Sequence, residues 1–347
     1  MKVNKWTLGL AAIGMVSIPT LSQAEEKMSP VQSALSSTVL SGYVDTSMQW
    51  NVGTGNAAVP GFAYNTPAKQ DGFNLNAVKI ALEKPLDEGQ WAAGYKTELL
   101  FGPNAATLGT LPNLGTGNSV NSQLAIKQAY VQLRAPVGVS GLDFKVGVFD
   151  TILGYESTDG PNNPNYTRSY GYTIEPTTHT GVLATYQLND MLGFSAMVAN
   201  SFGPAVGGST VGAGGVPATD RAFYTRAESY KTYGGSVAFK APSGWGFMEG
   251  STLYAGVING FNGGTGTGID QTSFYVGGTI ATPIKQLKLG ASYDYVATGS
   301  HFGSLYRNDV ALYASFQATE KLSFHLRGEY FSQSAGLVST SGGVLPG

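Results

Sequence analysis

The chain has 347 residues, of which 48 are glycine, none is cysteine and only 12 % are charged. Soluble domains average about 7 % glycine and about 25 % charged residues, so this composition is atypical of a compact soluble enzyme. The net charge of −2 excludes a basic nucleic-acid-binding surface, and the lack of cysteine excludes disulfides and thiolate metal sites.

The first 24 residues have the pattern of a secretory signal peptide. Lys2 and Lys5 precede a short apolar run, and the small residues Ser22 and Ala24 come before the expected cleavage point. The run is too short to span a bilayer, and Glu25 rather than cysteine follows, so neither a membrane anchor nor a lipoprotein is indicated. We expect residues 1–24 to be a cleaved signal peptide and residues 25–347 to form a single domain.

About thirteen later segments, of nine to twelve residues, alternate between apolar and polar side chains, which predicts β-strands. In chain order they lie near 39–50, 77–84, 90–101, 124–134, 142–148, 179–188, 191–200, 232–240, 251–259, 271–282, 286–296, 309–317 and 322–330. Long connections, near 51–72, 102–123, 150–178, 201–231, 260–270 and 297–308, alternate with short ones. Outer-membrane barrels have short periplasmic turns and longer outward loops, so the mature N-terminus is expected on the periplasmic side.

The apolar side of these segments is almost free of Asp, Glu, Lys and Arg. A charged side chain facing lipid near the bilayer midplane costs about 2–4 kcal/mol, and tilted membrane strands need about 9–11 residues. The pattern therefore predicts an all-β, transmembrane, antiparallel up-and-down barrel with its apolar side facing lipid. Phe73 and Leu75 are out of phase with Val78 and Ile80, and Lys127 falls in the apolar phase, so we expect a β-bulge at each place.

Thirteen is an odd number of strands, whereas bacterial single-chain barrels close with an even number. The sequence also ends on Gly347 and not on an aromatic residue in a last strand. We therefore expect the sequence to be truncated at its C-terminus, with a complete barrel of about 14–16 strands.

Charged residues on the polar side of the strands are the expected lining of a lumen. Seven positive and six negative residues nearly cancel, so no ion selectivity follows, and pairing between neighbouring strands is the expected role of each charge. The candidate lining residues are Lys79, Lys96, Glu98, Arg134, Asp143, Lys145, Lys288, Asp294, Arg327 and Glu329. The lumen of a barrel with this many strands is too wide for side chains to fill, so it should hold water unless a loop or plug occupies it.

One block of the sequence resembles a known family. The strand end F-K-V-G-V-F-D-T-I-L-G-Y-E-S leads through N-P-N-Y-T-R-S-Y-G-Y-T-I-E-P-T-T-H-T-G into the next strand, V-L-A-T-Y, within residues 144–188. This block resembles the outer-membrane β-barrel porin-2 family, and looser likeness extends over most of the mature chain. The resemblance implies a bacterial outer-membrane barrel that passes small solutes, and it specifies no substrate.

The same block allows three interpretations. His179 with Glu175 or Asp159 and a serine such as Ser169 has the residue types of a hydrolase, but the chain has no G-x-S-x-G or H-E-x-x-H motif. In the second interpretation, the tyrosines pack the loop against the barrel wall, and Arg168 binds Glu156 or Glu175. In the third, the loop folds inward as a pore constriction, whose candidate residues are Arg168, Glu175, His179, Tyr166 and Tyr170.

The sequence thus predicts an outer-membrane porin with a water-filled channel for passive diffusion of small hydrophilic solutes. It predicts no enzymatic activity, no cofactor and no metal. Expected partners are outer-membrane lipid and small hydrophilic solutes, with a homo-oligomer such as a trimer left open. The alternatives are a non-conducting structural or adhesive surface barrel and a barrel-embedded hydrolase.

Overall fold

A computed structural model describes residues 37–49, 72–107, 124–200, 231–262, 269–298 and 305–334. In these ranges, antiparallel strands form one sheet in which each strand pairs with the next in the chain. The strands are β1 (Val39–Gln49), β2 (Gly72–Lys84), β3 (Ala93–Phe101), β4 (Leu124–Ala135), β5 (Leu142–Asp150), β6 (Thr178–Gln187), β7 (Leu192–Ala199), β8 (Thr232–Lys240), β9 (Thr252–Asn262), β10 (Ile269–Ala281), β11 (Leu287–Thr298), β12 (Leu305–Thr319) and β13 (Leu322–Gln333). The prediction of sequentially paired antiparallel strands is confirmed.

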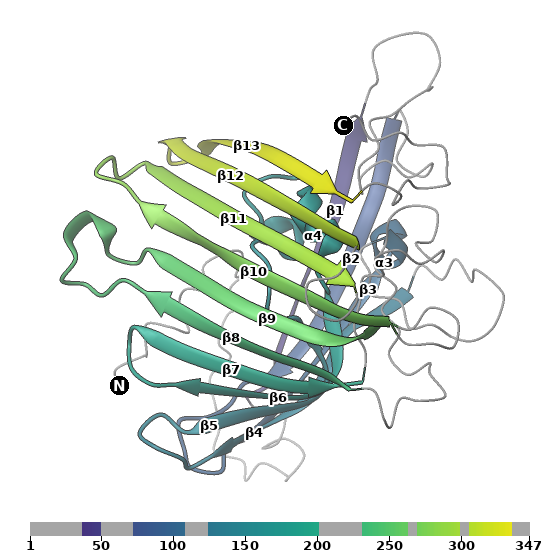
Figure 1. Cartoon of the computed structure of the whole chain (residues 1–347), viewed down its shortest axis with the longest axis vertical. Helices are drawn as coiled ribbons and strands as arrows, with labels where there is room; N and C mark the ends of the chain where they lie inside the picture. Colours follow the sequence, from purple (N-terminus) through teal and green to yellow (C-terminus); the bar gives the residue numbers. More distant parts are fainter. Residues whose placement is uncertain are drawn as a thin grey trace, which may run out of the picture.

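The sheet is strongly curved, so that β1–β3 lie behind β10–β13 and the concave side faces inward (Figure 1). The short helix α4 (Tyr170–Ile174) lies on this concave side, and α3 (Pro103–Thr107) lies beside β2–β4. Two further short helices, η2 (Gly160–Asn162) and η3 (Gly246–Met248), occur in connections. Within the described ranges, β1 and β13 are the two edges of the sheet. Residues 335–347 lie outside those ranges, so the expected C-terminal truncation stays a prediction.

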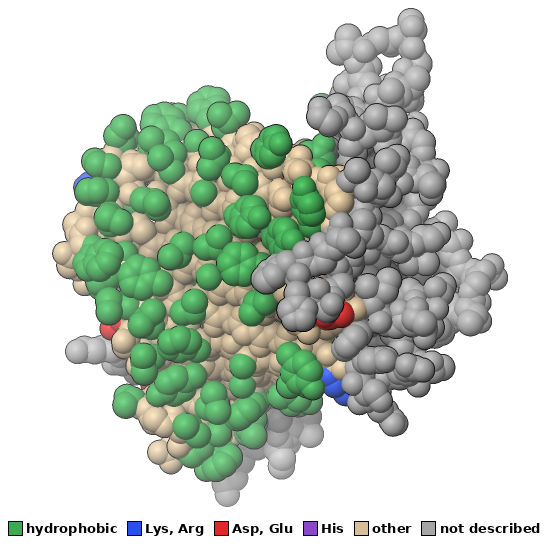
Figure 2. All heavy atoms as spheres, in the orientation of Figure 1, with side chains coloured by type: hydrophobic (Ala, Val, Ile, Leu, Met, Phe, Trp, Pro, Cys, Tyr) green, Lys and Arg blue, Asp and Glu red, His purple; other side chains and the backbone are tan. Residues whose placement is uncertain are grey.

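Apolar side chains cover the convex side of the sheet. Val44, Phe324 and Leu326 are 66 %, 59 % and 71 % exposed, as the alternation in their strands predicts for lipid-facing residues. Figure 2 shows hydrophobic side chains spread over the outer face of β8–β13, with the few charged atoms in view at its margins. The prediction that the apolar phase faces outward is confirmed.

Both predicted β-bulges are present. Between β1 and β2, Asp45 pairs with Ala77 and Thr46 with Leu75, which leaves Asn76 as the extra residue. Between β3 and β4, Glu98 pairs with Gln128 and Leu99 with Ile126, which leaves Lys127 as the extra residue. Each bulge turns its extra side chain to the interior, where Asn76 and Lys127 are 0 % and 1 % exposed.

Several strands extend beyond their predicted limits. β2 begins at Gly72 and not near residue 77, because the bulge at Asn76 interrupts the alternation on which the prediction rested. β9 continues to Asn262 and β10 begins at Ile269, so the connection between them is shorter than predicted. The other long loops predicted around 51–72, 102–123, 201–231 and 297–308 lie mostly outside the described ranges. Within those ranges, no helix is long and apolar enough to cross a membrane.

Apolar residues on the concave side pack against the connection between β5 and β6. Leu153 of that connection joins a buried cluster on β4–β10, formed by Tyr130, Phe149, Leu183, Met197, Ile258 and Tyr275. Ile174 of α4 packs with Val296 on β11 and Phe331 on β13. The long connection is therefore held against the wall at both its start and its end by burial of apolar side chains.

Candidate functional site

The residues that connect β5 to β6, 151–177, are called the inner loop here, because they lie on the concave side of the sheet. α4 begins after Ser169, whose hydroxyl accepts a hydrogen bond from the backbone N–H of Tyr172 at 3.1 Å and caps the helix. Gly171 is required for the close approach of α4 to the wall, because a Cβ there would collide with the carboxylate of Asp294 on β11.

The first attachment of the inner loop is to β1 and β2. The Asp159 carboxylate lies 2.6 Å from Lys79 Nζ on β2 and accepts a hydrogen bond from the Tyr43 hydroxyl on β1 at 3.1 Å. Seven residues along the loop, the hydroxyl of Tyr166 accepts a hydrogen bond from Asn76 Nδ2 at 2.6 Å. The bulge that turns Asn76 inward thus supplies one of the loop's contacts.

Lys79 belongs to a buried network of alternating charges. Glu98 lies 2.9 Å from Lys79, 3.1 Å from Lys96 and 3.2 Å from Lys127. Lys127 also lies 2.9 Å from Asp150 at the end of β5. Buried charges are tolerated when each has an opposite partner, so the network both neutralises these side chains and fixes the wall that holds Asp159.

The second attachment is to β13. Arg327 lies 3.0 Å from Glu156 of the inner loop and is also paired with Glu329 on its own strand. Its two terminal nitrogens donate to the carbonyl oxygens of Thr167 and Arg168 at 2.6 and 2.8 Å. One guanidinium therefore fixes two separate stretches of the loop, as its planar fork of donors allows.

Carboxylates on the last strands also bind the backbone where α4 begins. Glu329 on β13 accepts the N–H of Tyr170 at 2.6 Å, and Asp309 on β12 accepts the N–H of Gly171 at 3.0 Å. Within the loop itself, Glu156 accepts the N–H of Ser169 at 2.6 Å. Because these N–H groups have no partner within the helix, the carboxylates satisfy donors that burial would otherwise penalise.

The inner loop therefore spans the concave space between the first and last strands. Its attachments are to β1 and β2 on one side and to β12 and β13 on the other. A third contact joins the Tyr155 hydroxyl to Thr279 on β10 at 3.0 Å, and the Tyr155 ring stacks on Tyr313 of β12 at 4.1 Å between centroids.

The predicted constriction residues take different positions along this loop. Arg168 is buried, donates to the carbonyl oxygens of Tyr166 and Thr158 at 3.0 and 2.9 Å, and lies over the Tyr172 ring. Tyr170 stacks on Phe331 at 5.0 Å, whereas Tyr166 is 46 % exposed.

Glu175 and His179 lie at the loop's end and just beyond it. Glu175 is buried, and burial together with the nearby Asp294 carboxylate raises its pKa well above the ordinary value. His179 is already on β6, fully buried, with Nε2 at 3.1 Å from the Thr151 hydroxyl.

The predicted lumen residues all lie on strands, and several form the expected pairs. Arg134 binds Asp143 through two contacts of 2.6 and 2.7 Å, and these residues are directly opposite in the β4–β5 register. Lys96 lies 3.3 Å from Glu83, opposite it in the β2–β3 register. Lys145 lies over the Tyr130 ring at 4.8 Å, while Lys288 is exposed near the start of β11. Glu98, Asp294, Arg327 and Glu329 surround the inner loop or its supporting network.

Several residues of the site were missed from the sequence, and three of them show why. Asp309 lies at the start of the predicted strand 309–317, but the strand begins at Leu305, which places Asp309 inside the barrel wall. Lys127 was recognised as a phase break but not as an interior cation. Tyr43 could not be singled out from the sequence, because a tyrosine on the polar side of a strand is compatible with any lumen-facing position.

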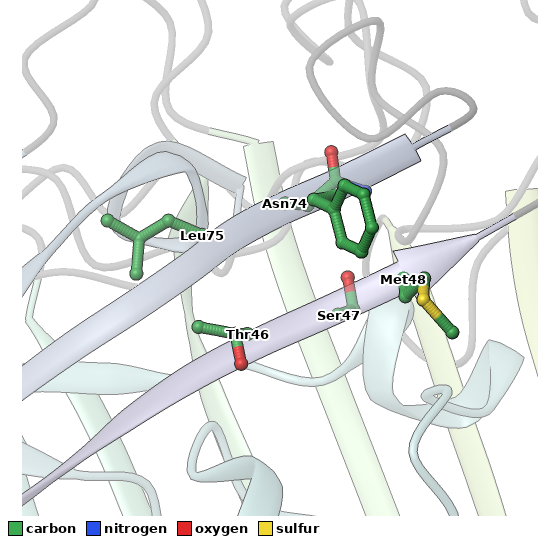
Figure 3. A pocket seen from close by; sticks show the side chains of 6 residues that line it. Thr46, Ser47, Met48, Asn74 and Leu75 are labelled. Atoms are coloured by element: carbon green, nitrogen blue, oxygen red, sulfur yellow. The ribbon is translucent and has the colours of Figure 1, made fainter.

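A shallow, open hollow of about 420 Å³ lies between the ends of β1 and β2. Figure 3 shows the side chains of Thr46, Ser47 and Met48 from β1 beside Asn74 and Leu75 from β2. Its lining includes the exposed side chains of Met48 and Leu75 and the hydroxyl of Ser47, which donates to Asn76.

Several solved outer-membrane proteins match the chain over most of its length, at low sequence identity and with TM-scores below 0.5. The outer membrane channel DcaP of Acinetobacter baumannii is 14 % identical, with 86 % of this chain and 79 % of that chain covered and a TM-score of 0.49. The anion-selective porin from Comamonas acidovorans is 12 % identical, with 86 % and 89 % covered and a TM-score of 0.38. OmpT of Vibrio cholerae, in its trimer form, is 10 % identical, with 75 % and 82 % covered and a TM-score of 0.37.

No curated protein sequence matches the chain. A family model, in contrast, matches residues 37–347, which include every strand of the sheet and the whole inner loop. The chain therefore belongs to the family described as Putative beta-barrel porin-2, OmpL-like, and forms an outer-membrane channel for small solutes.

Proposed function

We propose that the protein is a passive diffusion channel for small hydrophilic solutes and that the inner loop sets the narrowest part of its path. The observation that carries this proposal is the position of the loop, which is attached to strands on both sides of the concave space. Solutes then pass beside the loop and not through the full width of the barrel.

The constriction residues take two roles in this proposal. Tyr166, which is exposed, and Tyr170, which is partly exposed, contact passing solutes. The buried residues Arg168, Glu175 and His179 fix the shape of the loop from behind. The proposed lumen lining is Lys79, Lys96, Glu98, Arg134, Asp143, Lys145, Lys288, Asp294, Arg327 and Glu329; of these, the buried Glu98 and Asp294 support the inner loop from behind.

A non-enzymatic role is part of the proposal. Ser169, which is a serine of the type that a hydrolase would use, has its hydroxyl engaged in capping α4. The polar residues that are dense in the inner loop attach it to the barrel wall through ion pairs and backbone contacts. No catalytic role is needed to explain them. We further propose export after cleavage of residues 1–24, which mass spectrometry of the N-terminus in purified outer membranes would test.

The decisive experiment is planar-bilayer conductance of the full-length protein and of a variant in which a short Gly-Ser linker replaces residues 157–173. We expect a higher single-channel conductance in the variant, and faster entry of larger sugars in liposome swelling. A matched control shortens the connection between β8 and β9, 243–249, which should leave conductance unchanged. Equal conductance of the wild type and the loop variant would refute the constriction, and absence of conductance in both would refute the channel.

A further inference from the structure

Three carboxylates meet where α4 contacts the wall. Asp294 on β11 and Asp309 on β12 are directly opposite each other in the strand register, and both are almost completely buried. Glu175, at the C-terminal end of α4, is also buried, and its carboxylate lies near that of Asp294. Like charges directly opposite on neighbouring strands are ordinarily destabilising, so this arrangement needs compensation.

No cation neutralises these carboxylates directly. In the part of the chain that the structure describes, the ion pairs within 4.0 Å include none to Glu175, Asp294 or Asp309. One carboxylate oxygen of Asp294 and one of Asp309 are buried without a hydrogen-bond partner. The titratable and charged groups that face the cluster are Glu156, Tyr170 and Tyr172 of the inner loop, Tyr275 of β10, and Arg327 and Glu329 of β13.

Arg327 does not neutralise the three carboxylates, because its ion pairs are with Glu156 and Glu329. An unpaired ionised carboxylate in such a site becomes neutral by taking up a proton, because burial penalises the charged form. Two neighbouring buried carboxyl groups can hydrogen-bond to each other only if at least one of them carries a proton, since an ionised carboxylate has no donor. The described residues contain no group of three or more acidic or histidine side chains with the arrangement of a metal site.

We propose that Glu175 and Asp294 share one proton, and that uptake of this proton docks the end of the inner loop onto β11 and β12. The proton comes from water, binds one carboxylate and forms an O–H···O bond to the other. The inference rests on the proposed function in one respect: docking changes solute passage only if the loop narrows the channel.

The direction of the effect follows from linkage. In the docked loop the pKa of Glu175 lies well above its ordinary value, whereas in a released loop it returns to about 4.3. Docking is therefore strongest at acid pH, below the released-loop value, and weakens as pH rises toward the docked-loop value. For one shared proton the docking equilibrium changes by up to about tenfold per pH unit in that window.

The test measures loop position directly in the full chain, which has no native cysteine. Nitroxide labels on Asn162→Cys in the inner loop and Glu88→Cys in an exposed turn give a distance distribution by pulsed electron paramagnetic resonance. We expect one narrow distribution at pH 5 and a growing second population toward pH 9. In E175Q the amide donates to Asp294 without titrating, so the narrow distribution should persist at both pH values.

Two further variants complete the design. D294N should flatten the pH response in the same way as E175Q, and it replaces E175Q as the test if that variant does not fold. E249Q, in the exposed turn before β9, should respond like the wild type.

The proposal is overturned if the wild type shows the same distribution from pH 5 to pH 9, or if E175Q and D294N both respond like the wild type. Restoration of the narrow distribution at pH 9 by calcium chloride would also overturn it, since a cation would then be the occupant. Because the distances do not depend on conductance, a protein that passes no solute can still show the proton response. Failure of the proposed function and failure of this inference are thus distinguishable.

Discussion

Arg327 on β13 lies 3.0 Å from Glu156 of the inner loop, although 171 positions separate the two residues in the chain. The same guanidinium binds two loop carbonyl groups, so it attaches the loop to the last strand at three points. Glu156 is fully buried in its side chain and depends on this partner for neutralisation.

Replacing Arg327 with methionine should lower the free energy of unfolding by about 3–5 kcal/mol, because it leaves Glu156 buried without its cation. The loop also loses its attachment to β13, so single-channel conductance should rise. Urea unfolding in detergent and planar-bilayer recording measure the two effects. Lys321→Met removes an exposed cation from the β12–β13 turn and should cost no more than about 0.5 kcal/mol. Equal losses in the two variants would show that the ion pair stabilises nothing.

Lys79 and Asp159 should be energetically coupled. Lys79→Met and Asp159→Asn each remove the ion pair, with its 2.6 Å contact, that attaches the loop to β2. The double variant should be less destabilised than the sum of the two single variants, with an interaction energy of about 0.5–3 kcal/mol, as for residues in one buried network. Unfolding curves of the four proteins give this value. Strict additivity would mean that the two side chains stabilise the fold independently.

Gly171→Ala should destabilise the docked loop even though alanine is the better helix former. Its Cβ would collide with the Asp294 carboxylate and press on that of Asp309 at 3.2 Å, and overpacking of this kind costs about 1–3 kcal/mol. Gly244→Ala is the matched control, because open space surrounds that position in the exposed turn after β8. Thermal unfolding compares the two, and a neutral Gly171→Ala would contradict the close contact of α4 with the wall.

Val44→Arg should impair membrane insertion. Val44 is exposed on the outward side of β1, where arginine costs about 2–4 kcal/mol in the hydrocarbon layer. Ser41→Arg places the same side chain on the inward phase of the same strand, shared with Tyr43, and should insert nearly as well as the wild type. The folded fraction in lipid vesicles measures both. Equal insertion of the two variants would contradict the assignment of the lipid-facing side.

The sequence was sufficient to predict the sheet, because the period-two alternation directly reports which side of each strand faces lipid. It also predicted both bulges, since a bulge at Asn76 or Lys127 is visible as a break in that alternation. The membrane imposes this pattern uniformly on every strand, and for that reason it can be read without knowing any contact between strands.

The partners of the inward side chains could not be predicted in the same way. Alternation shows that Lys79 and Arg327 point inward, but not at what depth or toward which part of a loop. Those answers depend on strand register and on the path of the inner loop across the concave side. The block from Asn163 to Gly181 was recognised as special from its composition, whereas its contacts with Asp309 and Glu329 require the assembled wall.

The long sequence separation of the loop's contacts also determines when they can form during assembly. The inner loop precedes β6, yet its partners Asp309, Arg327 and Glu329 belong to the last two strands described. Its attachment to β12 and β13 must therefore await nearly the whole chain, and contacts between residues so far apart in sequence form slowly. Until then the loop can be held by its contacts with β1 and β2, so the constriction that we propose is completed late in assembly.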